Sequence, residues 1–298
     1  MLTLSSSSRD KNDVIRVRTL LYSLKHFCAR TDLGEFWIVS PEAELANIRA
    51  SLATEDLLDH SQFLSDELLC PALRYVKMSG WQKQQLLKLA MAPLISTEYY
   101  MTLDADLICI RRFDASSMRA EGRGICGAET AADYRALYKD SFAEHEVRVK
   151  QERVEWADRI LGSPRRPEYC GIFYSETPVM LHTSSVLDLT KFISESFKSP
   201  WTEALAANTP WTEYPVYFQF LERFNLLSRV HVVGNRNTML RLDQSLWQRS
   251  SCYRDPTKYE FSSWASHSSM FEDKHGFFIA VQSSLSLPPD AVRAFSES

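Results

Sequence analysis

The order in which apolar and amphipathic segments follow one another is the feature of this sequence that most constrains its fold. Residues 1–5 and 36–40 are short apolar segments of the kind found in buried strands. Between them, residues 13–29 place apolar side chains at intervals of three and four, which predicts a helix with one buried face. A strand, a helix and a second strand in this order predict a βαβ unit at the start of the chain.

The same alternation continues to the end of the chain. Helical patterns recur at 41–53, 79–95 and 183–197, and strand-like segments at 60–69, 99–103, 229–235 and 276–283. We therefore expect an α/β protein with a doubly wound, mainly parallel sheet, in which ligands collect at the carboxyl ends of the strands. Residues 129–168 are highly charged and predict a helical insertion, interpreted as a solvated excursion in preference to a binding arm. With no internal repeat and no flexible linker, residues 1–298 are expected to form one domain.

Two carboxylates interrupt the strand-like segment in the middle of the chain. Asp104 and Asp106 directly follow the apolar run 99–103. Alternate side chains on a strand share a face, so this pair can converge on one cation where the strand ends. Carboxylate oxygens are the ligands that Mg²⁺ and Mn²⁺ prefer. A polar turn that merely closes the strand is the alternative.

The charge and the cysteine content limit the kinds of binding partner and the cellular compartment that we expect for this protein. The 298 residues are 45% hydrophobic, and 34 Lys and Arg oppose 38 Asp and Glu, giving a net charge of −4. No basic block provides a nucleic-acid footprint, so a charged partner would be recognised locally. The six cysteines form no C-x-x-C pair and predict reduced thiols in a cytoplasmic protein. The sequence shows no leader and no apolar run of about 18 residues, and a peripheral membrane contact stays open.

Four segments resemble a known class of enzyme. The metal-dependent glycosyltransferases of the GT-A fold, which is Rossmann-like, carry an Asp-x-Asp motif after an apolar strand, as "YYMTLDADLICIRRF" does. Residues 80–113, 177–182, 211–224 and 277–290 resemble successive blocks of a largely uncharacterised, bacterial-type family of glycosyltransferase-like proteins. The first block is the most specific of the four. The resemblance spans most of the chain and implies a GT-A-like domain that uses nucleotide sugars.

The resemblance also implies roles for individual residues. Asp104 and Asp106 would hold Mn²⁺ or Mg²⁺ against the diphosphate of the sugar donor, with Asp106 also counted as catalytic, and the cation would stabilise the leaving group. A histidine from the C-terminal segment completes the metal site in many GT-A enzymes. His267 is favoured over His275 as this metal ligand. The alternative for each of the two histidines is that it lies in an exposed loop without binding a metal.

Glu213 is the candidate catalytic base. It lies in "TPWTEYPVYFQF", between Trp211 and Tyr214, whose rings could stack on a sugar and exclude water. Such surroundings raise the pKa of a carboxyl group and suit it to deprotonate an acceptor hydroxyl. The alternative is a glutamate at a helix N-terminus, where Thr212 would cap the helix and Pro215 would fit the first turn.

Further residues are candidates for binding the donor. Trp81, Gln84 and Lys88 share the polar side of the helix that precedes the Asp-x-Asp strand, where Lys88 could meet a phosphate and Gln84 a sugar hydroxyl. The turn after the first strand supplies Ser8, Arg9 and Asp10. Solvent exposure, or an ordinary serine-rich loop, is the alternative for each of these residues.

The function predicted from the sequence is sugar transfer from a nucleotide-diphosphate sugar to a hydroxyl acceptor, either a glycan, a lipid-linked glycan or another alcohol, in glycan or polysaccharide biosynthesis. A non-catalytic nucleotide-sugar or glycan-binding protein of the same fold is one alternative. A haloacid-dehalogenase-like phosphatase is another. It fits less well, because its motif needs Thr or Val two residues after the second Asp, where this chain has Ile108.

Overall fold

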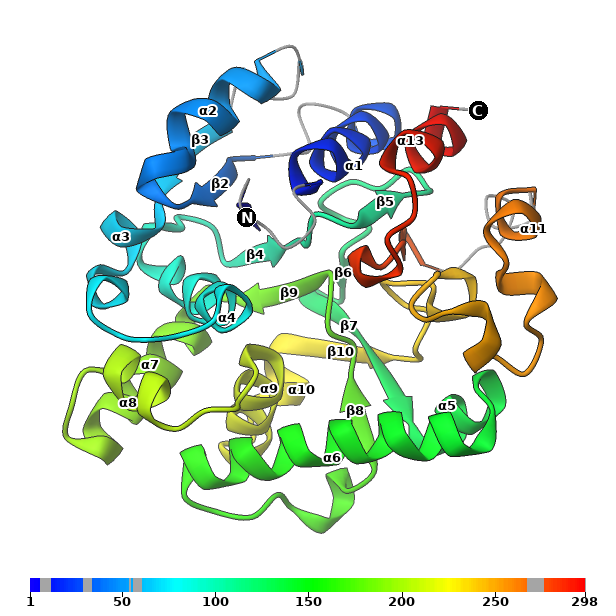
Figure 1. The fold of residues 1–298 in the computed structure, drawn as a ribbon. Helices are drawn as coiled ribbons and strands as arrows, with labels where there is room; N and C mark the ends of the chain where they lie inside the picture. Colours follow the sequence, from blue (N-terminus) through cyan, green and yellow to red (C-terminus); the bar gives the residue numbers. More distant parts are fainter. Residues whose placement is uncertain (6–11, 29–33, 54, 56–60, 267–275, 298) are drawn as a thin grey trace.

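The computed structural model describes residues 1–5, 12–28, 34–53, 55, 61–266 and 276–297 (Figure 1). Its strands are β1 (Leu2–Thr3), β2 (Phe36–Ser40), β3 (Ser61–Ser65), β4 (Tyr99–Thr102), β5 (Leu107–Cys109), β6 (Arg119–Ala120), β7 (Arg123–Thr130), β8 (Ile172–Tyr174), β9 (Val179–His182), β10 (His231–Gly234) and β11 (Phe278–Ala280). Its helices are α1 (Asp13–Phe27), α2 (Glu42–Leu52), α3 (Asp66–Leu69), α4 (Gly80–Ala90), α5 (Ala131–Leu137), α6 (Asp140–Leu161), α7 (Thr183–Phe197), α8 (Trp201–Ala207), α9 (Glu213–Arg223), α10 (Leu227–Val230), α11 (Phe261–Ala265) and α13 (Pro289–Glu297). The α/β class predicted from the sequence is confirmed.

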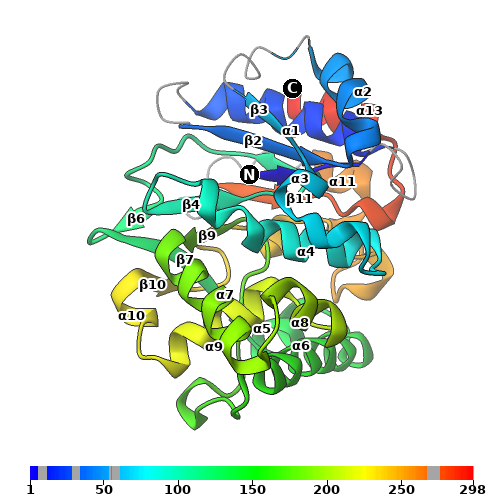
Figure 2. The same cartoon turned by 90° about the vertical axis from the view of Figure 1, so that its left-hand side faces the viewer.

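The strands lie between two layers of helices. Figure 2 shows α1, α2 and α13 on one side of the strands, and α5 to α10 on the other. The first side has a core of its own, in which Leu20, Leu21 and Leu24 of α1 pack with Ile38 of β2 and Ile48 of α2. The buried face predicted for the first helix is confirmed at these leucines. A second core lies among α4, α7, α8 and α9 on the other side.

The strand pairing is mixed, which differs from the mainly parallel sheet expected. Pairs β1–β2, β2–β3 and β7–β10 are parallel, whereas β4–β9, β5–β11, β6–β7 and β7–β8 are antiparallel. One physical reason is a tight hairpin. Glu121 and Gly122 have positive φ angles of 53° and 77°, the geometry of a two-residue turn that can join only antiparallel strands. No strand was expected in this region from the sequence, so the hairpin was not predicted.

The strand that leads into the Asp-x-Asp motif lies in the interior of the sheet. Strand β4 pairs with β9 along one edge, and Leu103 bridges to Leu2 of β1 along the other. The parallel strands β1, β2 and β3 continue from there. The βαβ opening predicted from the first forty residues therefore lies beside the motif.

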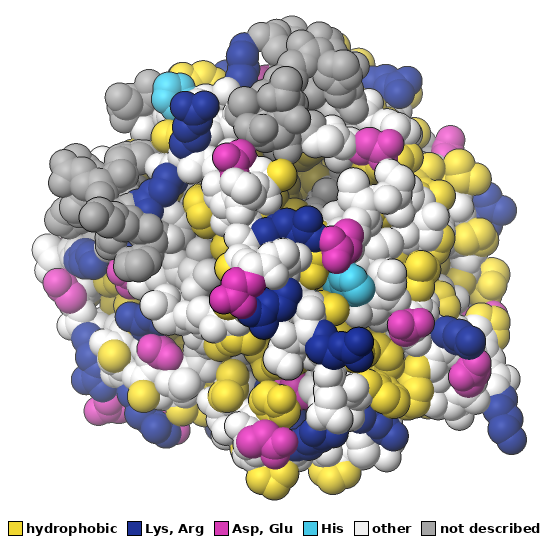
Figure 3. All heavy atoms as spheres, turned by 180° about the vertical axis from the view of Figure 1, so that it is seen from behind, with side chains coloured by type: hydrophobic (Ala, Val, Ile, Leu, Met, Phe, Trp, Pro, Cys, Tyr) yellow, Lys and Arg dark blue, Asp and Glu magenta, His cyan; other side chains and the backbone are white. Residues whose placement is uncertain are grey.

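Three further findings concern the chain as a whole. No helix in the described part of the chain is long and apolar enough to cross a membrane. The six cysteines are all free thiols, four of them buried. Figure 3 shows the face opposite to that of Figure 1, where charged side chains of both signs are interspersed with hydrophobic ones.

Candidate active site

The turn between β4 and β5 carries both aspartates of the motif. The backbone fixes this turn at each end, because Leu103 N donates to Met1 O (2.9 Å) and Val281 N donates to Asp106 O (2.9 Å). The first contact comes from the residue before β1 and the second from the residue after β11. Segments from the N-terminal and C-terminal parts of the chain therefore meet at the Asp-x-Asp turn and hold it in place.

A polar cleft of about 420 Å³ opens over this turn. Its walls come from elements that are distant in the sequence, chiefly α4, the Asp-x-Asp turn, α6 and the segment around residue 282. The residues that line it are Thr3, Asp13, Trp81, Gln84, Gln85, Lys88, Asp104, Ala105, Asp106, His145, Glu146, Val149, Lys150, Arg153, Glu176, Thr177, Trp247, Gln248, Gln282 and Ser283. The structure thus brings together five of the residues predicted from the sequence: Trp81, Gln84, Lys88, Asp104 and Asp106.

Lys88 is the buried centre of the site. Its Nζ lies 2.9 Å from Oδ1 of Asp104 and 2.9 Å from Oε1 of Glu213, and its side chain is only 3% exposed. Burial alone would lower the pKa of Lys88, but the charges of Asp104 and Glu213 outweigh burial and raise it well above its ordinary value. Lys88 is therefore an ammonium ion held between two carboxylates. Solvent exposure, the alternative from the sequence, is wrong for this residue.

The two aspartates have different surroundings. Asp104 is 34% exposed at its side chain and uses Oδ1 in its contact with Lys88. Oδ2 of Asp106 accepts a hydrogen bond from Ser283 N (3.1 Å). Burial raises the pKa of Asp106 to about 7, the charge of Asp104 adds to the rise, and the Ser283 N–H and Arg16 oppose it. Asp106 therefore binds a proton more readily than a solvated aspartate does.

The donor set of this turn suits a hard divalent cation. Each aspartate has a second carboxylate oxygen besides the one in the contacts above, and both residues face the same cleft. Mg²⁺ and Mn²⁺ are commonly held by one or two carboxylates, with substrate phosphates and waters filling the other positions. Within the described residues, no group of three or more His, Cys, Asp and Glu is arranged to hold a metal. The residues present fit a site of the two-carboxylate kind.

Glu213 lies behind Lys88 and away from the cleft. It is the first residue of α9, 1% exposed, and Thr212 precedes it without capping the helix through its side chain. Trp211 and Tyr214 are also buried: the Trp211 Nε1 donates to Leu205 O (2.7 Å), and the Tyr214 hydroxyl lies 2.8 Å from Thr102 Oγ1. The expectation that these two rings stack on a sugar is therefore wrong, because both belong to the core.

The face of α6 that looks into the cleft was not predicted. The charged segment 129–168 was expected to be a solvated excursion, but it begins inside β7, and α6 contributes His145, Glu146, Val149, Lys150 and Arg153 to the cleft. Glu176 accepts from both Lys150 (2.9 Å) and Arg153. Ion pairs thus join α6 to the segment that follows β8.

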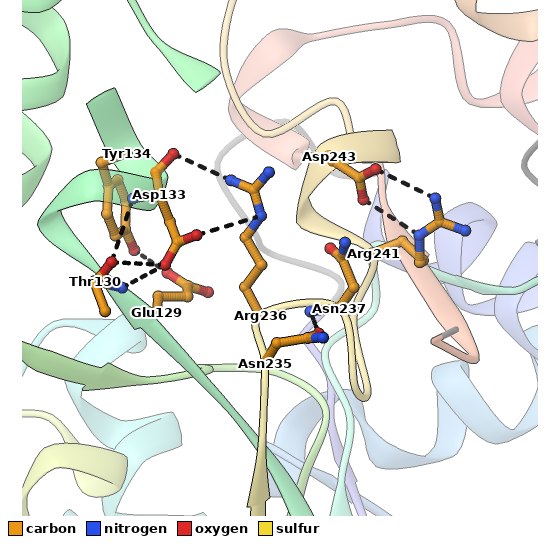
Figure 4. Close-up of polar contacts among 9 residues, drawn as sticks. All are labelled: Glu129, Thr130, Asp133, Tyr134, Asn235, Arg236, Asn237, Arg241 and Asp243. Atoms are coloured by element: carbon orange, nitrogen blue, oxygen red, sulfur yellow. Dashed lines mark hydrogen bonds and ion pairs between the residues drawn. The ribbon is translucent and has the colours of Figure 1, made fainter. Parts of the chain in front are cut away.

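Polar contacts fix the chain that leads from β10 to the cleft residues Trp247 and Gln248. Figure 4 shows them: Arg236 donates to Asp133 O (3.1 Å) at the start of α5, and Arg241 contacts Asp243 (3.2 Å). Asn237 N donates to Oδ1 of Asn235 (2.9 Å). The Arg236 contact joins the loop to α5, and the other two contacts lie within the loop.

A family model described as a family of unknown function, DUF6492, matches residues 1–296. The chain belongs to the DUF6492 family. No curated protein matches this DUF6492 sequence.

Three solved structures are similar in overall path to this DUF6492 chain. Mouse xyloside xylosyltransferase 1 in its apo form has a TM-score of 0.48 at 13% identity, covering 96% of this chain and 98% of that one. The galactosyltransferase LgtC in complex with donor and acceptor sugar analogs has a TM-score of 0.47 at 8% identity, covering 99% of this chain and 94% of that one. The apo WbbM bifunctional glycosyltransferase has a TM-score of 0.46 at 11% identity, covering 94% of this chain and 44% of that one.

Several residues predicted for the DUF6492 site lie outside the described residues. They are Ser8, Arg9, Asp10, His267 and His275. Conversely, sequence reasoning missed the cleft residues Asp13, His145, Lys150, Arg153, Glu176 and Trp247. The one signal for the α6 residues was helical spacing, since His145, Val149 and Arg153 step by four.

Proposed function

We propose that this DUF6492 protein is a metal-dependent glycosyltransferase with a GT-A, Rossmann-like fold. It moves a sugar from a nucleotide-diphosphate sugar to a hydroxyl acceptor in glycan biosynthesis. The observation that carries the proposal is that Asp104 and Asp106 lie on one turn and line one polar cleft of about 420 Å³, with Asp104 in contact with the buried ammonium group of Lys88. The motif resemblance and the geometry of the turn support the same reaction class.

The charges at this end of the cleft suit a diphosphate held through a cation. A bound Mn²⁺ or Mg²⁺ would act as a Lewis acid and neutralise charge on the departing nucleotide. Asp104 and Asp106 are the residues that would hold that cation. Lys88 keeps Oδ1 of Asp104 in a fixed direction. Gln84, one turn before Lys88, offers an amide to a donor hydroxyl.

Glu213 takes a positioning role in this proposal. Its carboxylate is 1% exposed and lies 2.9 Å from the Lys88 ammonium, so an acceptor hydroxyl in the cleft would meet Lys88 first. Glu213 therefore orients Lys88 between two negative charges. Catalysis by Glu213 as a base is the alternative.

The proposal predicts that nucleotide and metal bind together. In a thermal-shift screen, the nucleoside diphosphate with the preferred nucleobase should raise the melting temperature of the protein by several degrees when Mn²⁺ is present. The reason is that a ligand that binds only the native state stabilises that state. The shift should be much smaller with EDTA. Equal shifts with and without the metal would contradict metal-bridged binding, and no shift with any nucleoside diphosphate would contradict the proposed donor class.

A further inference from the structure

Trp81 is an exposed aromatic side chain in a mostly polar cleft. It is 48% exposed, although it lies in the first turn of α4 and lines the same cleft as the aspartates. Lys88 follows it by seven residues, which places the two side chains about 10 Å apart along the helix axis. Such a distance exceeds the width of one sugar ring. This spacing leaves room for a donor sugar between the Asp-x-Asp turn and Trp81.

A fixed group of polar side chains lies against one face of the Trp81 ring. The guanidinium carbon of Arg153 lies 5.9 Å from the centre of the Trp81 ring. Arg153 and Lys150 both contact Oε1 of Glu176, and the three side chains are 26%, 13% and 22% exposed. Half-buried ion pairs of this kind hold their donors and acceptors in place with polar atoms still open to the cleft. The arrangement offers an aromatic face and an adjacent row of hydrogen-bonding groups.

The charges that line the cleft do not favour an anionic ligand at this end. Its lining cations are Lys88, Lys150 and Arg153, and its lining carboxylates are Asp13, Asp104, Asp106, Glu146 and Glu176. Each of these three described cations already has a carboxylate within 4 Å. A carboxylate or sulfate on the ligand would add a further negative charge to a cleft that already has five carboxylates and only three cations. A neutral hydroxyl group needs only a hydrogen bond.

We propose that Trp81, Arg153 and Glu176 form the acceptor subsite, and that the acceptor is an uncharged carbohydrate whose ring stacks on Trp81. The inference rests on the proposed function and deepens it. Aromatic side chains bury the C–H face of a pyranose, while carboxylates and guanidinium groups bind its hydroxyls. Trp81, which the sequence suggested as a donor residue, is thereby reassigned to the acceptor.

The test is binding of the full-length protein to an array of defined glycans, both neutral and acidic, followed by saturation-transfer NMR with the neutral oligosaccharide that binds most strongly. Trp81→Ala should weaken that binding at least tenfold, and Trp81→Phe should restore part of it. Tyr75→Ala serves as the matched control, since Tyr75 is an exposed aromatic (66%) outside the cleft, and it should bind like wild type. Glu176→Gln should also weaken binding.

The outcomes separate this inference from the proposed function. Wild-type affinity in Trp81→Ala, a preference for acidic glycans, or no carbohydrate binding at all would overturn the acceptor subsite. Binding of a nucleoside diphosphate with Mn²⁺, measured on the same Trp81→Ala protein, should persist. Loss of nucleotide binding in Trp81→Ala would instead place Trp81 in the donor site and overturn the reassignment.

Discussion

Replacing Asp106 with Asn should lower kcat by roughly 10³-fold and abolish the dependence of nucleotide binding on Mn²⁺. The substitution keeps the shape of the side chain and an oxygen for the Ser283 N–H, but it removes one of the two negative charges that face the cation. Metal ions contribute several kcal/mol of charge stabilisation to such reactions, and about 1.4 kcal/mol corresponds to each factor of ten in rate. Initial rates and metal titrations measure the effect.

Asp188→Asn is the matched control for this experiment. Asp188 is an exposed aspartate on α7 and does not line the cleft, so the same chemical change there should leave kcat unaltered. A normal kcat in Asp106→Asn, or an equal loss in both variants, would contradict the role given to the Asp-x-Asp turn.

The second large effect is expected on stability. Lys88→Met should lower the free energy of unfolding by about 3–5 kcal/mol, because it leaves the carboxylate of Glu213 buried without its counter-charge. Adding Glu213→Gln to Lys88→Met should recover much of that loss, since the double variant buries no isolated charge there. Denaturant titrations measure both values. Lys191→Met is the control: its ion pair with Glu195 is exposed and worth less than about 1 kcal/mol.

The single variant Glu213→Gln separates positioning from base catalysis. A positioning role predicts lower stability, a reduction in kcat of about tenfold, and an unchanged pH dependence of the rate. A catalytic base predicts a loss of about 10²–10⁴ in kcat, with the acidic limb of the pH profile removed and the stability unchanged. A stability equal to wild type would contradict the buried ion pair with Lys88.

The sequence predicted well those features that depend on local pattern. The spacing of Val17, Leu21 and Leu24 gave the buried face of α1, since helical periodicity is a property of one segment. The apolar run before Asp104 and Asp106 likewise placed the motif at a strand end, which is where the turn between β4 and β5 lies.

Features that depend on distant partners were not predictable in this way. Helical periodicity assigned Lys88 to a polar side, but its burial depends on Glu213, a residue 125 positions later that α9 brings beside α4. The charged face of α6 is a similar case, because only the folded chain shows that Glu176 pairs with Lys150 and Arg153. Composition could not distinguish these paired charges from solvated ones.

The mixed sheet illustrates a related limit. Segment 99–103 and its partner Val179–His182 both have strand-like sequences, yet neither pattern shows whether the two strands pair in parallel or antiparallel. Direction follows from the connections between strands, and these include helices and a short hairpin at Glu121 and Gly122.

The most direct test of the proposed function is an NMR time course of the purified protein with Mn²⁺, the nucleotide sugar whose nucleotide it binds, and a neutral oligosaccharide. The proposal predicts that the anomeric signal of the donor disappears while signals of the free nucleoside diphosphate and of a new glycosidic linkage grow, and that EDTA stops both. A donor that stays bound yet is never consumed would contradict the proposal and identify a binding protein.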